Sequence, residues 1–281
     1  MNPQPESQPL NDAPEGLLAA SPDTPHPRLR LHRGFRGRHL PDARDIIVYL
    51  PPGYEEEPER TYPVLYMQDG QNLFDPTTSY VAGKDWRVDQ TAQRLIREGK
   101  IQPLIIVGVY HAGEKRVDEY TPTKDTKRNG GKAETYLKAL TQVIKPFIDR
   151  EYRTHACAWN TALAGSSLGG LFTLHAGLEH PEIFGKLAAM SPSAWWDRRY
   201  IIREVERLPI KSRQSIWIDI GTREAAGAVG DARSLRDAFL EKGWTENADL
   251  RYVEAQGAVH DEAAWAARDG PMLEFLFPTT M

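Results

Sequence analysis

Two kinds of hydrophobic pattern alternate along this chain. Short runs rich in Val, Ile, Leu and aromatic residues, bounded by turn residues, predict β-strands, and longer runs with apolar residues at helical spacing predict α-helices. The predicted strands cover residues 29–35, 45–50, 64–67, 104–110, 159–164, 187–190, 215–220 and 250–254. The predicted helices cover about 85–98, 133–150, 168–180, 197–208 and 231–241, and a last one begins near residue 262.

Local signals sharpen the helix boundaries. Asp85 and Asp197 each precede a segment with helical periodicity, and they are predicted N-caps. Pro146 falls inside the helix predicted over 133–150. Because proline lacks the backbone N–H that a helix interior uses, we expect a kink or a restart at this position.

The order of these elements defines the fold class. Strands alternate with helices of about ten or more residues, which predicts an α/β fold, with a mostly parallel sheet covered by helices on both faces. No internal repeat or second boundary stands out, so we expect a single domain over residues 28–281. Residues 1–27 are rich in Pro, Asn, Gln, Ser and acidic residues and lack a basic stretch followed by an apolar core. We therefore expect a disordered tail and not a secretory signal.

Composition narrows the choice of partners. The 281 residues carry a net charge of −4, which gives no reason to expect nucleic acid or an anionic membrane, and no apolar run reaches the roughly 18 residues of a transmembrane helix. Cys157 is the only cysteine, so no internal disulfide forms and we predict a cytoplasmic protein. No Cys/His set has the spacing of a metal site, and we expect neither a metal nor another cofactor. A small molecule is the expected partner.

One junction in the pattern carries chemistry. Gly165-x-Ser167-x-Gly169 stands between the strand predicted over 159–164 and the helix that follows it. Small residues two positions on either side of a serine let strand and helix approach closely, and the strained turn exposes the hydroxyl at the tip of the sheet. Ser167 is therefore the candidate nucleophile. The amide of Leu168, at the helix N-terminus, points to where an oxyanion would form.

A base and an acid are expected at the ends of other strands, because the carboxyl ends of strands are where chemistry gathers in open α/β sheets. His260 follows the last predicted strand, and an imidazole, with a pKa of about 6.5, can take the proton of Ser167. A carboxylate on its other nitrogen would fix the tautomer. Glu224, just after the strand over 215–220, is the first choice for this carboxylate.

Two other carboxylates are alternatives for the acid. Asp219 lies inside the run IWIDIG, where its side chain can point away from the site. Asp231 lies at the start of the next predicted helix and is a third choice.

A second oxyanion donor is expected from the loop after the strand over 64–67. Gly70 allows a sharp turn there, and the backbone N–H of Gln71 is the candidate donor. Asp69 in the same loop is interpreted as structural, bracing the turn through its own backbone.

Taken as a set, these residues and their neighbours resemble the Putative esterase family of α/β-hydrolases. That family includes enterochelin esterase-like enzymes, S-formylglutathione hydrolase, feruloyl esterase modules and mycolyltransferases. The resemblance implies an α/β-hydrolase fold with Ser167 as nucleophile, His260 as base, and main-chain donors at Gln71 and Leu168. The matching segments run from about Leu29 to the C-terminus and are LYMQDGQNLFD, the DW pair, RVDEYTP, AGSSLGG, SPSAWW, DIGTRE and GAVHDEAAW. The form QDGQNLF and the twin Trp look closest to the enterochelin-esterase-like branch.

The expected reaction is hydrolysis of a carboxylic ester through an acyl-enzyme, carried by a Ser-His-acid triad. Candidate substrate-binding residues are Trp86, Arg116, Trp195 and Trp196, with one of the twin Trp expected in the core. Aromatic side chains in a pocket favour a bulky or aromatic ester, such as a siderophore. Acyl transfer to an alcohol or thiol, a catalytically inactive scaffold that binds a ligand, and an amide or peptide hydrolase are the alternatives. The acyl group, the alcohol group and the oligomeric state do not follow from the sequence.

Overall fold

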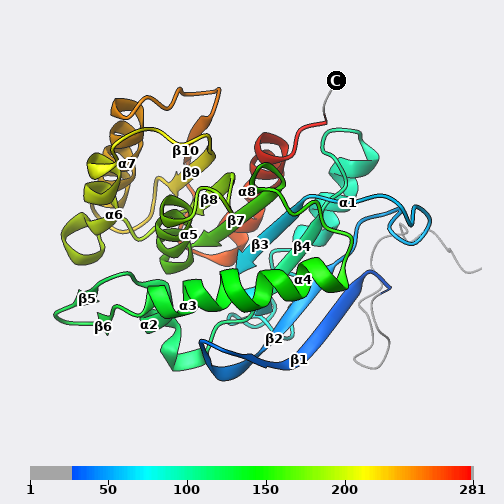
Figure 1. Ribbon diagram of the computed structural model, residues 1–281. Coiled ribbons are helices and arrows are strands. Elements are labelled where there is room, and N and C mark those ends of the chain that lie inside the picture. The colour runs from blue at the N-terminus through cyan, green and yellow to red at the C-terminus, as the bar shows by residue number, and fades with distance from the viewer. Residues whose placement is uncertain (1–26, 280–281) are drawn as a thin grey trace, which may run out of the picture.

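An eight-stranded sheet runs through residues 27–279, the part of the chain that the computed structural model describes (Figure 1). The strands follow the order β1-β2-β4-β3-β7-β8-β9-β10 across the sheet. The six from β4 to β10 are parallel to one another, and β2 pairs antiparallel with both β1 and β4 at one side. Their bounds are Leu29–Gly37 (β1), Leu40–Tyr49 (β2), Val64–Gln68 (β3), Ile105–Val109 (β4), Thr161–Ser166 (β7), Lys186–Met190 (β8), Ser215–Gly221 (β9) and Leu250–Ala255 (β10).

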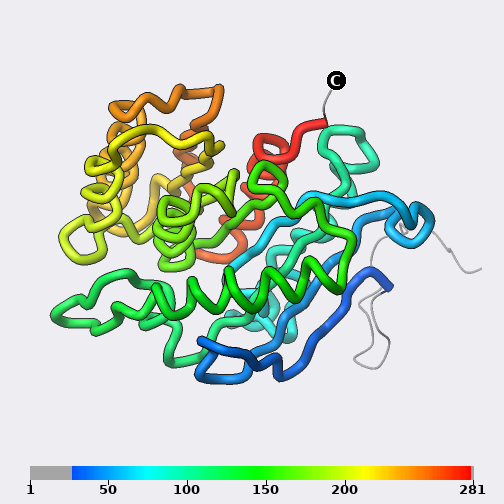
Figure 2. The backbone as a smooth tube through the Cα atoms, viewed as in Figure 1, coloured from blue at the N-terminus to red at the C-terminus, as the bar shows by residue number. Residues whose placement is uncertain are grey.

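Helices cover both faces of the sheet, as the alternation of strands and helices predicts. Buried side chains of α2 to α7 join one core cluster, and those of α1 and α8 join a second on the opposite face. In Figure 1 α3, α4 and α5 stand in front of the sheet, and Figure 2 shows α6 and α7 side by side at one end. The bounds are Val88–Arg97 (α1), Arg116–Tyr120 (α2), Ala133–Ala139 (α3), Lys145–Glu151 (α4), Leu168–Glu179 (α5), Trp196–Arg207 (α6), Ala228–Glu241 (α7) and Glu262–Leu276 (α8).

Alternate side chains of each central strand enter the two cores. Tyr66 of β3 joins the core beneath α3 to α5, whereas its neighbours Leu65 and Met67 join the core beneath α1 and α8. Every residue of β3 and of β4 is buried. Parallel strands that are buried on both faces read as continuous apolar runs, which is why the sequence pattern finds them.

The irregularity predicted at Pro146 is present as a widened helix. The segment predicted over 133–150 forms α3, a π-helical stretch Leu140–Ile144, and α4. Pro146 lies in the first turn of α4. It has no N–H to offer the carbonyl of the residue four positions earlier, and its ring would clash with that carbonyl, so the backbone widens just before it.

The two predicted N-caps are wrong. The N-cap of α1 is Arg87, which has a left-handed φ of 53°, and no side chain caps this helix end. Asp197 lies inside α6, with a φ of 38°. In both cases a buried tryptophan stands at the start of the helix, because Trp86 lies two residues before the first residue of α1 and Trp196 is the first residue of α6. Burial of these large rings sets where the backbone turns, and this tertiary constraint overrides the local capping preference.

Short elements near the carboxyl ends of the strands are absent from the sequence-based prediction. They are the 3₁₀ turn η1 (Gly70–Asn72), the helix α2, and a small hairpin of β5 (Lys124–Asp125) and β6 (Asn129–Gly130). None is long enough to show a periodic pattern. The tail predicted over 1–27 lies outside the described residues, apart from its last residue.

Within residues 27–279, no helix combines the length and the apolar character that crossing a bilayer requires. The cytoplasmic location stays a prediction.

Candidate active site

Ser167 occupies a tight turn between β7 and α5. Its φ of 57° and ψ of −120° lie in a region that non-glycine residues rarely adopt. The turn is so close that a Cβ atom on Gly165 would lie 2.6 Å from the carbonyl carbon of Gly169. The amide of Ser167 donates to the carbonyl of Met190 at the end of β8, 3.0 Å away. This is the geometry of a nucleophile elbow, which presents the hydroxyl above the strand ends.

A chain of hydrogen bonds leads away from the hydroxyl. The Nε2 atom of His260 lies 3.0 Å from Ser167 Oγ, and its Nδ1 atom lies 2.6 Å from Glu224 Oε2. His260 stands in the loop between β10 and α8, where Asp261 caps α8 by accepting from the amide of Ala264. The imidazole can thus take a proton from the serine while the carboxylate holds its other nitrogen.

Glu224 follows β9, and several donors hold its carboxylate. Its Oε1 atom accepts from the amide of Gly221 at 2.8 Å and from the hydroxyl of Ser191 at 2.5 Å. Burial acts to raise the pKa of this carboxyl, but the hydrogen bonds from His260, Ser191 and the main chain outweigh burial, so the pKa of Glu224 is lowered. The carboxylate therefore stays ionised at neutral pH.

The two alternative acids point elsewhere. Asp219 is fully buried in β9, and its carboxylate accepts from Arg268 Nε at 2.9 Å and from Trp217 Nε1 at 2.7 Å. Asp231 pairs with Arg199 at 2.7 Å. Of the three carboxylates weighed from the sequence, Glu224 is the one in contact with the imidazole.

Both predicted oxyanion donors are at helix starts. Leu168 is the first residue of α5, and Gln71 lies within the 3₁₀ turn η1. Amides in the first turn of a helix have no partner within that helix. The two segments touch, because a Cβ atom on Gly169 would lie 3.1 Å from Gln68 Cβ and 3.5 Å from Asp69 Oδ2. The structure thus brings the β3–η1 loop against the elbow.

The role of glycine in the β3–η1 loop differs from the sequence-based interpretation. The residue with a left-handed φ is Asp69, at 57°, while Gly70 is not among the residues of positive φ. Gly70 is required for a different reason, because a Cβ atom there would lie 2.4 Å from the carbonyl carbon of Gly108 in β4. The sharp turn is made by an aspartate, and the glycine lets the loop rest on the neighbouring strand.

Asp69 holds this loop through its side chain as well as its backbone. Its carboxylate accepts two hydrogen bonds from Arg116, at 2.7 Å and 2.8 Å, and its amide donates to the hydroxyl of Tyr120 at 3.1 Å. The Arg116 side chain retains 26% of its exposure and lies over the Tyr120 ring. The structural interpretation of Asp69 fits these contacts, and Arg116 is both a brace and a side chain that a ligand can reach.

The four candidate substrate-binding side chains differ in exposure. Trp195 is 41% exposed, and the Arg128 guanidinium lies 4.8 Å from the centre of its ring. Trp196 is buried, and its Nε1 donates to a main-chain carbonyl in the loop before β5. Trp86 is also buried and packs against Trp265 with ring centres 5.9 Å apart. Trp195 and Arg116 are therefore the members of this set whose side chains keep part of their exposure, and Trp196 is the member of the twin pair that lies in the core, as expected of one of the two. Trp86 is buried as well, and a role for these side chains in substrate binding stays a prediction.

Several residues at the site escaped the sequence reasoning. Ser193 Oγ lies 3.4 Å from Ser167 Oγ, and the Trp265 ring lies edge-on to the imidazole of His260 at 4.9 Å. Ser191 is a third such residue, because its hydroxyl contacts the Glu224 carboxylate. The signal was available in part, since SPSAWW directly follows β8 and so falls at a strand end.

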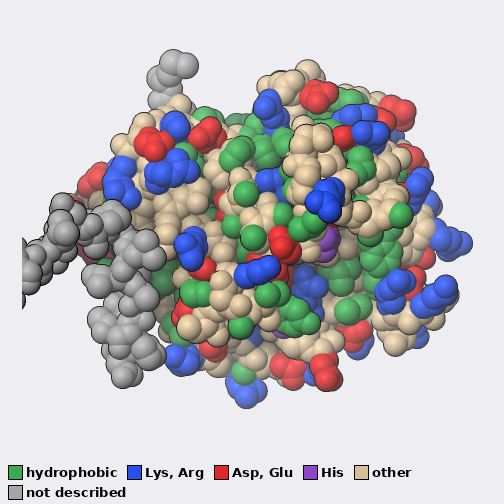
Figure 3. Space-filling model, turned by 180° about the vertical axis from the view of Figure 1, so that it is seen from behind, with side chains coloured by type: hydrophobic (Ala, Val, Ile, Leu, Met, Phe, Trp, Pro, Cys, Tyr) green, Lys and Arg blue, Asp and Glu red, His purple; other side chains and the backbone are tan. Residues whose placement is uncertain are grey.

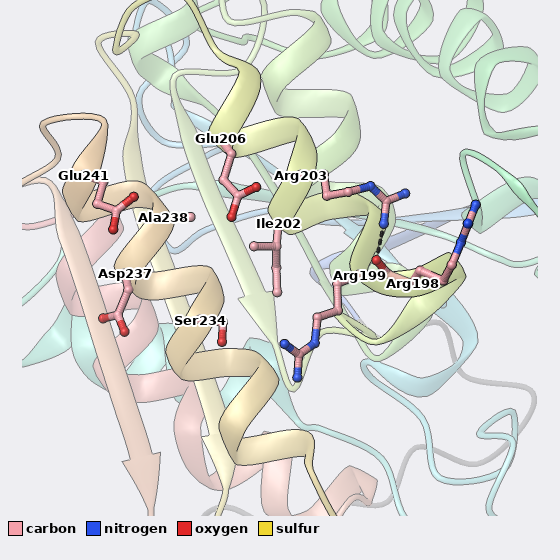
Figure 4. A pocket seen from close by; sticks show the side chains of 9 residues that line it. All are labelled: Arg198, Arg199, Ile202, Arg203, Glu206, Ser234, Asp237, Ala238 and Glu241. Carbon is pink, nitrogen blue, oxygen red and sulfur yellow. Dashed lines mark hydrogen bonds between the residues drawn. The ribbon is translucent and has the colours of Figure 1, made fainter.

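Two clefts elsewhere on the surface contain none of Ser167, His260 and Glu224, and Trp86 is among the residues that line the larger of them. One, of about 320 Å³, lies between α6 and α7 and carries both signs of charge, from Arg199 and Arg203 to Glu206 and Asp237 (Figure 4). The other, of about 850 Å³, lies between α1 and α8. The side of the molecule that faces away from the viewer in Figure 1 also mixes basic and acidic side chains (Figure 3). Among residues 27–279, no group of three His, Cys, Asp or Glu side chains is arranged to hold a metal ion.

Comparison with known proteins gives a consistent picture. The family model described as Putative esterase matches residues 37–273. The chain is 37% identical over 238 residues to an endo-1,4-beta-xylanase/feruloyl esterase of Xylanibacter ruminicola, covering 82% of this chain but 29% of that protein. It is 24% identical to the uncharacterized protein YbbA of Bacillus subtilis, covering 87% and 97% of the two chains. It is 28% identical to the ferri-bacillibactin esterase BesA of the same species, covering 65% and 66%.

Solved structures share the fold. An IroE-like serine hydrolase from Shewanella oneidensis superposes with a TM-score of 0.71 at 21% identity, covering 88% of this chain and 80% of that one. The BES protein from Bacillus cereus gives a TM-score of 0.69 at 20% identity, with coverage of 93% and 99%. The mostly parallel sheet with helices on both faces is thus the α/β-hydrolase fold that the sequence predicted.

Proposed function

The chain belongs to the Putative esterase family and is a carboxylic ester hydrolase, and we propose that it works as a serine esterase through an acyl-enzyme on Ser167. The observation that carries the proposal is the continuous hydrogen-bonded series from Ser167 through His260 to Glu224, with contacts of 3.0 Å and 2.6 Å. A serine hydroxyl is a weak nucleophile unless a base is placed to take its proton.

The proposed reaction has two halves. Ser167 Oγ attacks the ester carbonyl while His260 Nε2 accepts the hydroxyl proton. The imidazolium, stabilised by Glu224, then gives that proton to the leaving alcohol, and the acyl group remains on the serine. Water, activated by the same imidazole, attacks the acyl-enzyme and releases the acid.

The oxyanion of each tetrahedral intermediate is proposed to rest on the amides of Leu168 and Gln71. Both lie at helix starts, where amides have no partner within the helix and the helix dipole favours negative charge. Each such donor typically stabilises the transition state by about 3–4 kcal/mol.

For the substrate we propose a bulky or aromatic ester, with a siderophore ester as one possibility to test. Support comes from the exposed Trp195, the reachable guanidinium of Arg116, and Arg128 above the Trp195 ring. Relatives are named as esterases of ferri-bacillibactin, of enterobactin and of feruloyl groups. An aromatic ring with polar or anionic substituents would meet a complementary surface at these side chains.

The test uses a p-nitrophenyl short-chain ester and a fluorophosphonate probe. Ser167→Ala is expected to lower kcat by about 10⁶-fold, as removal of a triad serine does elsewhere, and to abolish labelling. Ser193→Ala is the matched control, because Ser193 carries a second hydroxyl, 3.4 Å from Ser167 Oγ. This variant should still be labelled. Full activity in Ser167→Ala, or labelling that maps to Ser193, would sink the proposal.

Acyl transfer to an alcohol or thiol uses the same residues and is the second candidate. Product analysis with glycerol or a thiol present alongside water separates the two reactions, because transfer yields a new ester or thioester in place of the free acid.

A further inference from the structure

We propose that Ser191 is a positioning residue that holds the Glu224 carboxylate against His260 and connects it to a buried cation, Arg268. This inference rests on the proposed function, because it assigns a role within that triad. Ser191 directly follows β8 and is 1% exposed. Its hydroxyl lies 2.5 Å from Glu224 Oε1 and 2.9 Å from Arg268 Nη2.

The direction of the hydrogen bond to Glu224 follows from counting donors. A serine hydroxyl has one hydrogen to give and two lone pairs with which to accept. Trp265 Nε1, at 3.0 Å, and Arg268 Nη2, at 2.9 Å, are both donors without accepting capacity, so they occupy the two lone pairs of Ser191 Oγ. The one hydrogen of the hydroxyl is therefore left for Glu224, and it cannot rotate away without losing its only acceptor.

The backbone of Ser191 is fixed as firmly as its hydroxyl. Its amide donates to the carbonyl oxygen of Asp219 at 2.9 Å and approaches the Asp219 carboxylate at 3.2 Å. The same carboxylate pairs with Arg268 Nε at 2.9 Å. Asp219 therefore holds both Ser191 and the Arg268 side chain that bonds to it. Held in this way, Ser191 has a left-handed φ of 44°.

These contacts hold the Glu224 carboxylate in the orientation that the proposed triad requires. Glu224 must keep Oε2 on the imidazole, although His260 is 42% exposed and stands in a loop. With Oε1 held by Ser191 and by the Gly221 amide, the carboxylate has one orientation in which all three contacts form. A charge-assisted hydrogen bond of this kind is also stronger than a neutral one. The hydroxyl of Ser191 makes hydrogen bonds to Glu224, Trp265 and Arg268, and of these Glu224 is the one that bonds to the imidazole nitrogen, so Ser191 is proposed to act on catalysis through Glu224.

The test compares Ser191→Gly with Ser191→Ala. Both remove the hydroxyl, but glycine suits the left-handed φ and alanine does not, so the two variants should differ in thermal stability. If the hydroxyl positions the acid, kcat falls by a similar factor in both, about 10–100-fold, the range by which activity falls when the hydrogen-bond partner of a metal-ligating side chain is removed in metalloenzymes. KM should change by less than about threefold, because uniform substrate binding is untouched. A kcat that follows stability instead of the hydroxyl would overturn the proposal.

A double-mutant cycle supplies the second readout. In a Glu224→Ala background the hydroxyl has nothing to position, so Ser191→Gly should cost less than about twofold in kcat. An equal loss in both backgrounds would contradict the proposal. Failure of the serine esterase mechanism is distinguishable, because wild-type Ser167 would then not react with the fluorophosphonate probe. Labelled wild-type protein whose Ser191 variants keep full kcat would leave the mechanism standing and remove only this inference.

Discussion

Two buried polar networks support the proposed site from opposite faces of the sheet, and they end on different parts of the chain. The acid-side network lies on the face of α1 and α8, and it consists of Ser191, Asp219, Trp265 and Arg268. The oxyanion-side network lies on the face of α2 to α7. It consists of the Arg44–Glu119 ion pair and the hydrogen bond from Tyr136 to Gln68, which are joined where the Arg44 guanidinium lies over the Tyr136 ring. The first ends on the side chain of Glu224, whereas the second lies beneath the backbone of the β3–η1 loop.

This difference has a consequence for how each half of the site is encoded. On the acid side the chemistry depends on which side chain is present, since a carboxylate and a hydroxyl make the contacts. On the oxyanion side the proposed donors are amides, which every residue but proline has, so what matters is the path of the backbone. That path is set by the φ of Asp69 and by the contact of Gly70 with β4.

Of the substitutions that distinguish the two networks, one on the acid side has the largest expected effect. Glu224→Gln should lower kcat by about 10⁴-fold while leaving the fold intact, because an amide can present its NH₂ to Nδ1 and stabilise the wrong imidazole tautomer. Steady-state kinetics with a p-nitrophenyl ester, together with circular dichroism, measure both properties. A loss below tenfold would mean that the Glu224 carboxylate is not part of the catalytic triad. Gln71→Ala is the comparison, because its amide survives the substitution, and it should cost less than about threefold.

The backbone of the oxyanion side can be moved with a single methyl group. In Gly70→Ala the added Cβ would lie 2.4 Å from the carbonyl carbon of Gly108 and 2.8 Å from the amide nitrogen of Val109. The loop must therefore shift, and the amide of Gln71 moves with it. We expect kcat to fall by about 10²–10³-fold, the cost of one lost oxyanion donor, with slow but detectable fluorophosphonate labelling of Ser167. Unchanged kcat in folded protein would show that this loop does not carry a donor.

The buried ion pair of the oxyanion-side network should be visible in stability. Arg44 and Glu119 form two hydrogen bonds of 2.7 Å and 2.9 Å, and their side chains are 1% and 7% exposed. Glu119→Gln leaves the buried guanidinium without its counter-charge, so we expect the free energy of unfolding in urea to fall by about 3–5 kcal/mol.

The matched control for that measurement is the exposed pair of Glu57 and Arg60, whose side chains are 50% and 39% exposed. Glu57→Gln should change the free energy of unfolding by no more than about 1 kcal/mol. Equal effects in Glu119→Gln and Glu57→Gln would mean that burial does not distinguish the two pairs.

The sequence predicts the acid side and the oxyanion side unequally well. The parallel strands are recognisable because burial on both faces makes them continuous apolar runs. Ser167 and Glu224 follow two such strands, and His260 follows the edge strand β10, in which only Leu250 is buried. The structure brings the three side chains into hydrogen-bonding contact because the carboxyl ends of parallel strands meet at one edge. Residue type and position at a strand end were sufficient for these side chains.

Packing contacts were not accessible in the same way. Trp86, Trp195 and Trp196 look alike in sequence, yet two are buried and one is exposed, because exposure depends on which distant segments cover a ring. The support that Arg268 gives Ser191 joins positions 77 residues apart, and no local pattern announces it. In the β3–η1 loop the left-handed φ belongs to Asp69, whereas Gly70 provides the close approach to Gly108 of β4. A contact of this kind with a distant strand leaves no mark in the local sequence.

The smallest expected effect concerns a carboxylate on the acid-side face that forms no ion pair within residues 27–279. Asp89, in the first turn of α1, is 4% exposed, and burial raises its pKa to about 6 although backbone hydrogen bonds and Arg87 act to lower it. Asp85 nearby also raises it. Because the pKa of an unfolded aspartate is about 3.9, the folded state binds the extra proton between these two values. Stability therefore falls as pH rises from about 4 to about 6 and stays lower above that.

Asp89→Asn removes this ionisation and keeps the shape of the side chain. At pH 8 it should raise the free energy of unfolding by about 1–2 kcal/mol, less than the full pKa difference implies, because the amide of asparagine is itself a polar group that must be buried. At pH 4 the variant and the wild type should unfold at the same temperature. Thermal unfolding at several pH values measures the difference. A stabilisation that is equal at pH 4 and pH 8 would show that packing, and not the buried charge, is responsible. Asp219 lies on the same face and is paired with Arg268. The proposed contrast is that the charge of Asp219 is balanced by a cation whereas the charge of Asp89 is not, and that outcome would remove the contrast.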